Sequence, residues 1–476
     1  MPIVLYLILT ILCLGIVAEG LRNPARMYQF PFGAAAVFLG FIVLPLFGLL
    51  RAEHLPEWSL ERYLLMCILC LGACWLGDFC ARKRRAGPIK PHIVRMRDWL
   101  IGAGVLIVVG GVAHLRSRAA FQAGFDPNSG DMVAYGFFAT LLRYGFIMAV
   151  VASVKWRSRY ALVLAMLASF YYLDRIVFLG RRKDTFEFAF ILVASLWLVW
   201  RCAVPRPVVV AALVIAPLLL VSTGFYRSVV VSRTGERDWS RLKEIDPIEI
   251  MATVVTEGSS ETVAGVHLLS AMADEGTHDY GLRHWNWLVF NYIPAQVFGP
   301  AFKESLYLSI PEPVEISQRR YGYAPSSGST VTGMVDAYAS FWYFGALKFF
   351  AIAFVMQWLY RHALRGSMMM QCIYLYMMPM ALHTVTHHTH WFVSPWVHIA
   401  VFWMPAMWYA GRARKIEKPS FFGGRRNANR CHVSPPWAVP SRAPASGQRY
   451  RAHSCTGAMR QGHDLSMECR RRPNGV

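Results

Sequence analysis

The sequence predicts an all-α, polytopic integral membrane protein with about eleven transmembrane helices. Of its 476 residues, 55% are hydrophobic and only 16% are charged, whereas charged residues make up about 25% of soluble proteins. Apolar runs that approach or exceed roughly 18 residues, the length needed to cross a bilayer, recur along the chain. Basic residues gather in short loops between these runs, which is the distribution typical of cytoplasmic loops.

The chain divides into a membrane domain, residues 1–411, and a basic tail, residues 412–476. The tail contains 14 Lys or Arg against 3 Asp or Glu, has many Pro, Gly and Ser residues, and lacks hydrophobic periodicity. Such a composition predicts disorder. About half of the net charge of +21 lies in the tail and much of the rest in short loops. This pattern favours contact with anionic lipid over nucleic acid as a partner.

Hydrophobic periodicity and the basic loops together predict the topology. The first span lacks a basic region before it, so we interpret it as a membrane helix rather than a cleaved signal peptide. The most basic internal loop, residues 82–97, belongs in the cytoplasm, which places the N-terminus in the periplasm and the C-terminus in the cytoplasm. The predicted spans are 2–18, 31–50, 62–79, 99–114, 135–153, 160–179, 186–202, 207–223, 336–360, 369–386 and 391–410.

One basic loop, residues 180–184, falls on the external side of this topology. It contains three consecutive cations, and charges on this side oppose the orientation rule. Two explanations remain open: the long side chains reach from the membrane edge to water, or the charges have a functional role. Asp174 and Arg175 precede the loop in span six. Adjacent residues do not share a helix face, so we expect each to have a separate partner.

A large external loop, residues 224–335, separates spans eight and nine. Its first part predicts two amphipathic helices that divide near Gly258, because apolar residues recur at helical spacing. Residues 284–306 are apolar and aromatic but are interrupted by Pro294, Gly299 and Pro300. We interpret this stretch as an interfacial or re-entrant element, because a broken backbone cannot face lipid.

Residues 319–345 form the segment around which the candidate site is organised. This segment begins with two arginines and a Gly-, Ser- and Pro-rich loop and ends in the apolar sequence of span nine. It therefore brings cations, hydroxyl groups and flexible backbone to the water–lipid boundary, where an anionic group can bind. We interpret it as one wall of a site for a lipid-linked, phosphate-bearing sugar. An ordinary loop before a span is the alternative.

External cations from four regions have the chemistry needed to bind pyrophosphate, because guanidinium groups bind phosphate oxygens in pairs and stabilise developing negative charge. Glu257 is a candidate general base, and four other acidic residues of the large loop, Glu261, Asp274, Glu275 and Asp279, remain open for this role. The candidate catalytic residues are Arg182, Arg320 and Glu257. The candidate substrate-binding residues are Arg181, Lys183, Arg227, Lys303, Arg319, Ser329, Thr330, His387 and His390.

Several functional classes are disfavoured by missing motifs. His383 and His387 share a helix face and are able to hold a metal, but the glutamate of a metalloprotease motif is missing, so we favour substrate binding for the histidine-rich segment 383–390. We predict no metal or other cofactor. The sequence contains no Walker A or Rossmann motif, which disfavours an ATP-driven pump or an enzyme that uses a cytoplasmic nucleotide-sugar donor.

Residues 1–411 resemble the bacterial oligosaccharide repeat-unit polymerases of the O-antigen polymerase (Wzy-like) family. The resemblance rests on the number of spans, the external loop in the second half and three stretches: Gly180-Arg181-Arg182, Tyr292-Ile293-Pro294 with Lys303, and Gly328-Ser329-Thr330-Val331-Thr332-Gly333 before Tyr338 and Gly345. Arg181 or Arg182, Arg227 and Arg320 best fit the external arginines often essential in this family. The histidine-rich segment departs from the pattern, since a further cation is expected there.

The resemblance implies a glycosyltransferase of the bacterial inner membrane. Its substrates would be undecaprenyl-pyrophosphate-linked oligosaccharides, joined on the periplasmic face into O-antigen or exopolysaccharide, with a flippase and a chain-length regulator as partners. Two other functions remain open: an O-antigen ligase and a non-enzymatic transporter or flippase of lipid-linked sugars. A transporter is expected to contain inverted repeats with broken helices in both halves of the chain. Here the broken element occurs only in the second half, which favours an enzyme.

Overall fold

A computed structural model describes residues 1–52, 55–84, 94–122, 130–229, 239–240, 246–326 and 329–411. They belong to one compact unit, Met1–Lys415. The predicted disordered tail, residues 412–476, lies outside the described residues, and so do the side chains of residues 219–229 at the end of α10.

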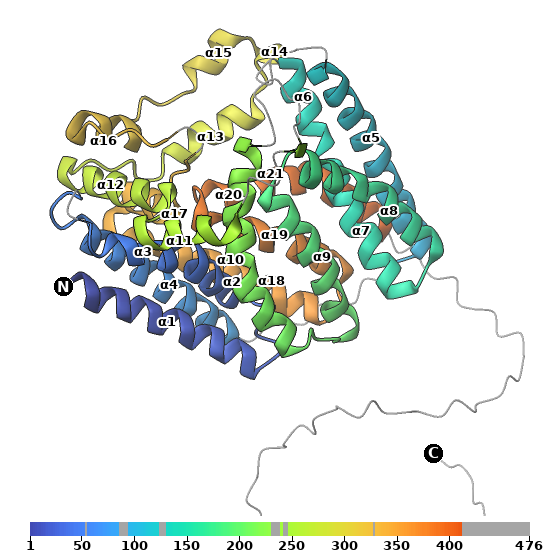
Figure 1. Cartoon of the computed structure of the whole chain (residues 1–476). Coiled ribbons are helices and arrows are strands. Elements are labelled where there is room, and N and C mark those ends of the chain that lie inside the picture. The colour runs from blue at the N-terminus through green and yellow to red at the C-terminus, as the bar shows by residue number, and fades with distance from the viewer. Residues whose placement is uncertain are drawn as a thin grey trace, which may run out of the picture. The chain divides into compact units, whose positions relative to one another are not determined.

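Every regular element among the described residues is a helix, which confirms the predicted all-α fold (Figure 1). Within the described part of the chain, seven helical segments are long and apolar enough to cross a membrane. They are Pro2–Arg22 (α1), Phe30–Leu49 (α2, η1 and α3), Ser59–Lys83 (α4), Met96–Ala120 (in α5), Met132–Trp156 (α6 and α7), Arg159–Phe178 (α8 and η2) and Gly333–Leu364 (α17, η4 and α18).

The other four predicted spans are also helical. They correspond to α9 (Arg182–Trp200), α10 (Arg206–Val229), α19 (Met368–Thr386) and a final stretch of α20 (His390–Val393), α21 (Pro395–His398), η5 (Ile399–Trp403) and α22 (Met404–Gly411). Helix α10 runs to Val229, beyond the predicted start of the external loop at residue 224. The total of eleven spans therefore remains a prediction.

Basic side chains cap the C-terminal ends of three helices. Arg361, in the last turn of α18 (Leu347–Leu364), donates to the carbonyl groups of Ala81 and Arg84 at the end of α4. Arg201 donates to the Leu364 carbonyl of α18, and Arg206 donates to the Arg22 carbonyl of α1. A cation near carbonyl groups that lack intrahelical partners stabilises a helix end. Helices α4 and α18 consequently end side by side.

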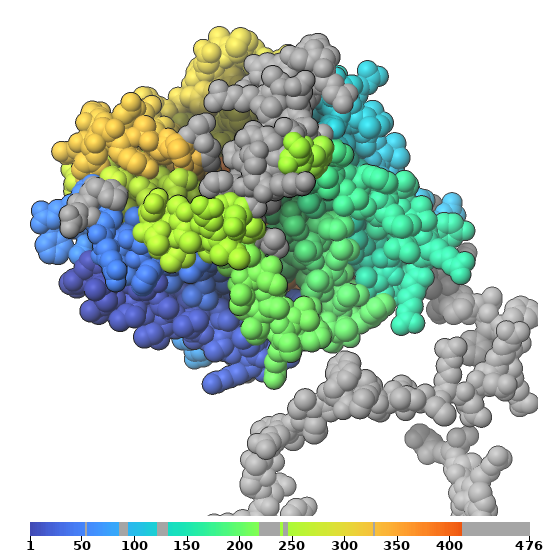
Figure 2. All heavy atoms as spheres, in the orientation of Figure 1, coloured from blue at the N-terminus to red at the C-terminus, as the bar shows by residue number. Residues whose placement is uncertain are grey.

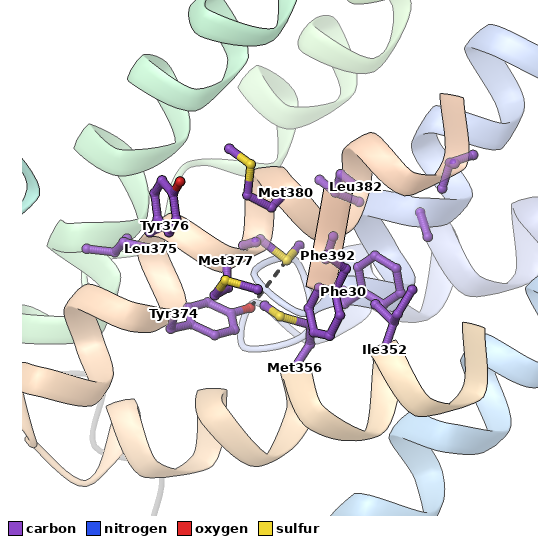
Figure 3. Packing of buried hydrophobic residues seen from close by; sticks show 14 of the residues in the cluster. Phe30, Ile352, Met356, Tyr374, Leu375, Tyr376, Met377, Met380, Leu382 and Phe392 are labelled. Carbon is purple, nitrogen blue, oxygen red and sulfur yellow. Dashed lines mark hydrogen bonds between the residues drawn. The ribbon is translucent and has the colours of Figure 1, made fainter. Parts of the chain in front are cut away.

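The centre of the bundle is filled by methionine and aromatic side chains where α2, α18 and α19 meet (Figure 3). Phe30, Met356, Tyr374 and Met377 are each at most 1% exposed. Methionine fits irregular gaps because its side chain is unbranched and flexible. The Tyr374 hydroxyl group donates to the Tyr28 carbonyl, so the polar atom at the centre of this core has a partner.

The predicted span over residues 336–360 is helical, but a break divides it into more than one helix. Helix α17 (Gly333–Phe341) is followed by the short 3-10 turn η4 (Trp342–Ala346), and Trp342 has φ 53°. A Cβ atom on Gly345 would lie 1.8 Å from the Ala337 carbonyl oxygen. Eight residues of straight helix span about 12 Å, so the chain turns sharply after α17 and η4 packs against α17.

The two amphipathic helices predicted in the loop between spans eight and nine are α11 (Pro247–Glu257) and α12 (Ser260–Glu275), and their division at Gly258 is confirmed. Gly258 has φ 86°, which is unfavourable for residues with a Cβ atom. The side chains of Asp246 and Ser259 accept backbone N–H groups and cap the two helices. Helix α12 packs on α4.

The helices between α12 and α17 are short. The element interrupted by Pro294 and Gly299 forms α13 (Arg283–Tyr292), α14 (Ala295–Phe298) and α15 (Pro300–Ser305), which confirms the predicted breaks. Helix α16 (Pro313–Tyr321) then returns along α12 (Figure 1). The face in Figure 2 shows the N-terminal helices in blue on one side and α6–α8 in teal on the other.

Candidate functional site

A buried network of charges holds the start of α9. Arg143 of α7 is 7% exposed, and its guanidinium group lies 2.5 Å from Asp184 Oδ1 and 3.3 Å from Glu187 Oε2. Arg175 Nε lies 2.6 Å from the other oxygen of Asp184. The Tyr172 hydroxyl group donates to Glu187 Oε1 over 2.6 Å. Two carboxylates of α9 are thereby fixed against α7 and η2, which sets the direction of the cations at the start of α9.

Asp174 and Arg175 have separate partners, as their adjacent positions predict. Asp174 Oδ1 lies 3.2 Å from the Arg118 guanidinium group, and its other oxygen lies 3.5 Å from His114 Nε2. Arg175 instead pairs with Asp184. Both residues lie in the π-helical turn η2 (Asp174–Phe178), where their side chains contact different neighbours.

The histidine-rich segment lies beside the cationic start of α9. Lys183 Nζ lies 4.2 Å from the centre of the Trp391 ring, a favourable cation–π distance. The rings of His383 and His387 have centres 3.7 Å apart, and the His383 ring lies 5.1 Å from that of Trp391. The pKa of His387 is lowered to about 3, first by burial and then by the positive charges of Lys183, His388 and Arg182. His387 is therefore neutral at physiological pH.

Asp336 of α17 orders the other side of the same segment. Its side chain is 1% exposed and accepts hydrogen bonds from the backbone N–H and the hydroxyl group of Thr389. Lys348 Nζ lies 3.3 Å from Oδ2, and His388 Nδ1 lies 3.4 Å from Oδ1. A carboxylate on Nδ1 holds the ring in the tautomer whose Nε2 accepts a proton. The pair of Asp336 and His388 therefore has the chemistry of a general base.

Four of the predicted site residues come together here: Arg182, Lys183, His387 and His390. Arg182 is close enough to influence His387 electrostatically, and the His390 ring stacks 4.1 Å from the Trp287 ring. Burial, followed by the charge of His388, lowers the pKa of His390 to about 3. Arg181 lies exposed immediately before α9.

The predicted loop before α17 contacts the histidine-rich segment through its backbone and hydroxyl groups. Thr330 Oγ1 donates to the Thr386 carbonyl oxygen over 3.0 Å. A Cβ atom on Gly333 would lie 1.8 Å from the Thr384 carbonyl oxygen, so only glycine permits this approach. Ser329 Oγ lies 2.8 Å from Ser326 Oγ. These contacts position the loop and engage the hydroxyl groups of Ser329 and Thr330.

Other predicted residues form a second charged cluster on α12 and α16. Arg319 and Arg320 both pair with Glu275, at 2.7 and 3.2 Å. Their side chains are 63% and 44% exposed. Asp274 lies 2.5 Å from the Arg62 guanidinium group of α4. Two of the candidate bases are thus engaged in ion pairs that join α4, α12 and α16.

The last three predicted residues are not brought to the histidine-rich segment by any described contact. Lys303 donates to the Phe290 carbonyl oxygen over 2.9 Å. Glu257 is exposed at the end of α11 and forms no ion pair with a described residue. Arg227 lies in α10, and its side chain is outside the described part of the chain.

Sequence reasoning missed the charged residues that organise the site: Arg143, Asp336, Lys348 and His388. The first three lie within or beside apolar sequence, and ionisable residues inside membrane segments are costly and usually functional. That signal identifies Arg143 and Lys348 directly, because both lie well inside predicted spans, and Asp336 lies at the start of one. The contact between Asp336 and His388 depends on the sharp turn after α17 and on the bend after α19, which the sequence pattern does not reveal.

Comparison with family models, curated proteins and solved structures finds no match for this chain. The resemblance to O-antigen polymerases consequently remains a prediction from sequence, and the function must be argued from the site.

Proposed function

We propose that the protein is a metal-independent membrane glycosyltransferase of the bacterial inner membrane. It polymerises undecaprenyl-pyrophosphate-linked oligosaccharide repeat units into O-antigen or exopolysaccharide on the periplasmic face. One observation carries the proposal: Lys183, next to Arg182 in sequence, contacts Trp391 beside the histidine-rich segment, and the same segment contains His388, which pairs with Asp336. Anion recognition and proton acceptance are the two functions that this transfer requires.

The cations act on the donor. In the transfer, the bond between the anomeric carbon and the pyrophosphate oxygen breaks, and negative charge builds up on the leaving group. Arg182 stabilises that charge, and protonated Lys183 adds to it; burial, followed by the charge of Arg143, lowers the pKa of Lys183 to about 7. Neutral His387 and His390 add hydrogen-bonding groups without adding charge.

The Asp336–His388 pair acts on the acceptor. The terminal sugar of the second substrate attacks the anomeric carbon through a hydroxyl group, whose proton passes to His388 Nε2. Asp336 stabilises the imidazolium that forms, as a buried carboxylate does for a catalytic histidine. The proton then leaves to solvent or to the released pyrophosphate. His388 replaces Glu257 as the proposed base because Glu257 makes no described contact with the cations.

Two other functions use part of this arrangement. An O-antigen ligase would use the same donor with a lipid A-core or protein acceptor. A transporter or flippase would need the cations but no base, so the Asp336–His388 pair favours an enzyme. The exposed cations Arg319 and Arg320 would serve substrate entry in any of these cases.

The native host provides the test through its surface glycan. Arg182→Ala and His388→Ala should each leave acceptors that carry a single repeat unit, and the exposed Arg159→Ala at the start of α8 should leave chain length unchanged. Long chains that remain on the lipid carrier would indicate a ligase, and lipid-linked units trapped inside would indicate a flippase. Normal glycan in both site variants would refute the site. Arg320→Ala tests the sequence-based role of that residue in the same strain.

A further inference from the structure

A second polar site lies in a crevice between α1, α2 and α4, away from the histidine-rich segment. Asp78 marks its position on α4, about 24 Å along the helix from Arg62, since 16 residues rise about 1.5 Å each. Glu19 in the last turns of α1 and Arg26 in the following loop complete its polar side. The crevice is lined by Ile16, Glu19, Gly20, Arg26, Gln29, Pro31, Phe32, Trp75, Asp78 and Arg82.

The charges in the crevice balance. Arg82 lies 2.7 Å from Asp78 Oδ2, and Arg26 pairs with Glu19. Two acids and two arginines leave no net charge. A free phosphate or an anionic lipid headgroup would therefore gain little from the arginines, because the two carboxylates oppose it.

One carboxylate oxygen and one guanidinium nitrogen in the crevice nevertheless have no hydrogen-bond partner among the described residues. Asp78 is 1% exposed, and no described residue donates to its Oδ1 atom. Arg82 Nε likewise has no acceptor among the described residues. Buried polar atoms normally have partners, because leaving one unpaired costs about 1–3 kcal/mol. An unmet acceptor and an unmet donor side by side match a ligand that carries both a cationic N–H group and a phosphate.

Size and position restrict this ligand further. The empty volume of the crevice is about 240 Å³ including space open to the surroundings, and its sheltered space holds about one water-sized group. A primary ammonium group has that size. Ile16, Phe32 and Trp75 supply apolar walls, and α1, α2 and α4 belong to segments long enough to cross a membrane. The crevice lies near the ends of α1 and α4, which is the depth of lipid headgroups.

We propose that this crevice binds phosphatidylethanolamine. The ammonium group donates to Asp78 Oδ1 and Glu19, the phosphate accepts from Arg26 and Arg82, and an acyl chain runs along the apolar wall at Trp75. Phosphatidylcholine fits poorly because its quaternary ammonium has no N–H group and exceeds the room beside Asp78. Phosphatidylglycerol supplies no cation for the carboxylates. The site is independent of the proposed glycosyltransferase activity.

Native mass spectrometry of the purified, delipidated full chain tests this site. The protein receives equimolar phosphatidylethanolamine, phosphatidylcholine and phosphatidylglycerol with identical acyl chains. One charge-assisted hydrogen bond gives roughly tenfold selectivity or more, so phosphatidylethanolamine should be retained at least about tenfold better. Asp78→Asn should reduce this preference to about onefold. Arg82→Gln removes a phosphate contact that all three lipids share, so it should weaken the retention of all three. Glu61→Gln, at the opposite end of α4, is the matched control and should keep the preference.

Three results would overturn the proposal. Equal retention of phosphatidylethanolamine and phosphatidylglycerol would show that the crevice does not select a zwitterion. An unchanged preference in Asp78→Asn, or unchanged retention of all three lipids in Arg82→Gln, would place the bound lipid elsewhere on the surface. Displacement of the lipid by an equal concentration of glycerophosphoethanolamine would identify a soluble headgroup rather than a membrane lipid as the ligand.

Discussion

Asp336 should be one of the most sensitive positions in the protein. Its carboxylate is 1% exposed and compensates the ammonium group of Lys348, whose side chain is 16% exposed. It also accepts the backbone N–H and hydroxyl group of Thr389. Asp336→Ala removes these interactions at once. It leaves Lys348 without its carboxylate and detaches the histidine-rich segment from α17.

The expected loss in free energy of unfolding follows from the ion pair between Asp336 and Lys348. Removing one partner of a buried ion pair costs about 3–5 kcal/mol, because the remaining charge stays buried without compensation. Lys348→Ala should cost less, since Asp336 keeps its hydrogen bonds to Thr389. The double variant should be more stable than the sum of the single effects by about 1–3 kcal/mol, because neither charge is then left alone.

Chemical unfolding of the purified protein in detergent measures these free energies. The exposed Glu249 of α11 supplies the control, and Glu249→Ala should change the free energy of unfolding by less than about 0.5 kcal/mol. A cost below about 1 kcal/mol for Asp336→Ala would refute the reasoning. Strict additivity in the double variant would likewise show that the two side chains do not interact.

Three further predictions concern other parts of the site. Arg143→Met should lower the free energy of unfolding by about 3 kcal/mol, since it leaves Asp184 and Glu187 without their buried cation; a change below about 1 kcal/mol would contradict the network. Gly333→Ala should destabilise the protein because its Cβ atom would meet the Thr384 carbonyl oxygen, whereas Gly72→Ala, with open space at its Cβ position, should be neutral or stabilising by up to about 1 kcal/mol. His387 and His390 have pKa values of about 3 in the folded protein and about 6.5 when unfolded, so below pH 6.5 the unfolded state binds more protons and stability should fall as the pH drops toward 3. Unfolding midpoints at pH 7 and 5 should show this loss, and it should shrink in His387→Gln; an equal loss in that variant would argue against a buried neutral His387.

Much of the fold follows from local pattern. The apolar runs predict the helical segments, Gly258 predicts the division of α11 and α12, and Pro294 and Gly299 predict the breaks around α14. Each of these features is encoded by a few neighbouring residues. The break after Phe341 was not predicted, because Trp342 is a non-glycine residue with positive φ and nothing local indicates that conformation.

The candidate site depends more strongly on long-range contacts. Alternating topology places the cations of α9 and the histidine-rich segment on one side, and the structure brings Lys183 onto Trp391. The partners of Arg319 and Arg320 were not predictable, because the pairing with Glu275 requires α16 to return along α12. The role of Asp336 was missed for a similar reason. Its contact with His388 spans 52 positions in sequence, which include the whole of η4, α18 and α19.

Reconstitution tests the central claim most directly. The purified full chain is placed in liposomes with undecaprenyl-pyrophosphate-linked repeat units from the native host, and both glycan length and released undecaprenyl pyrophosphate are measured. The wild-type protein should lengthen the glycan and release one undecaprenyl pyrophosphate for each linkage formed. His388→Ala and Arg182→Ala should form far fewer linkages and release correspondingly less undecaprenyl pyrophosphate. Failure of the folded wild-type protein to form any linkage, or equal rates in the two variants and the wild type, would contradict the proposed glycosyl transfer at this site.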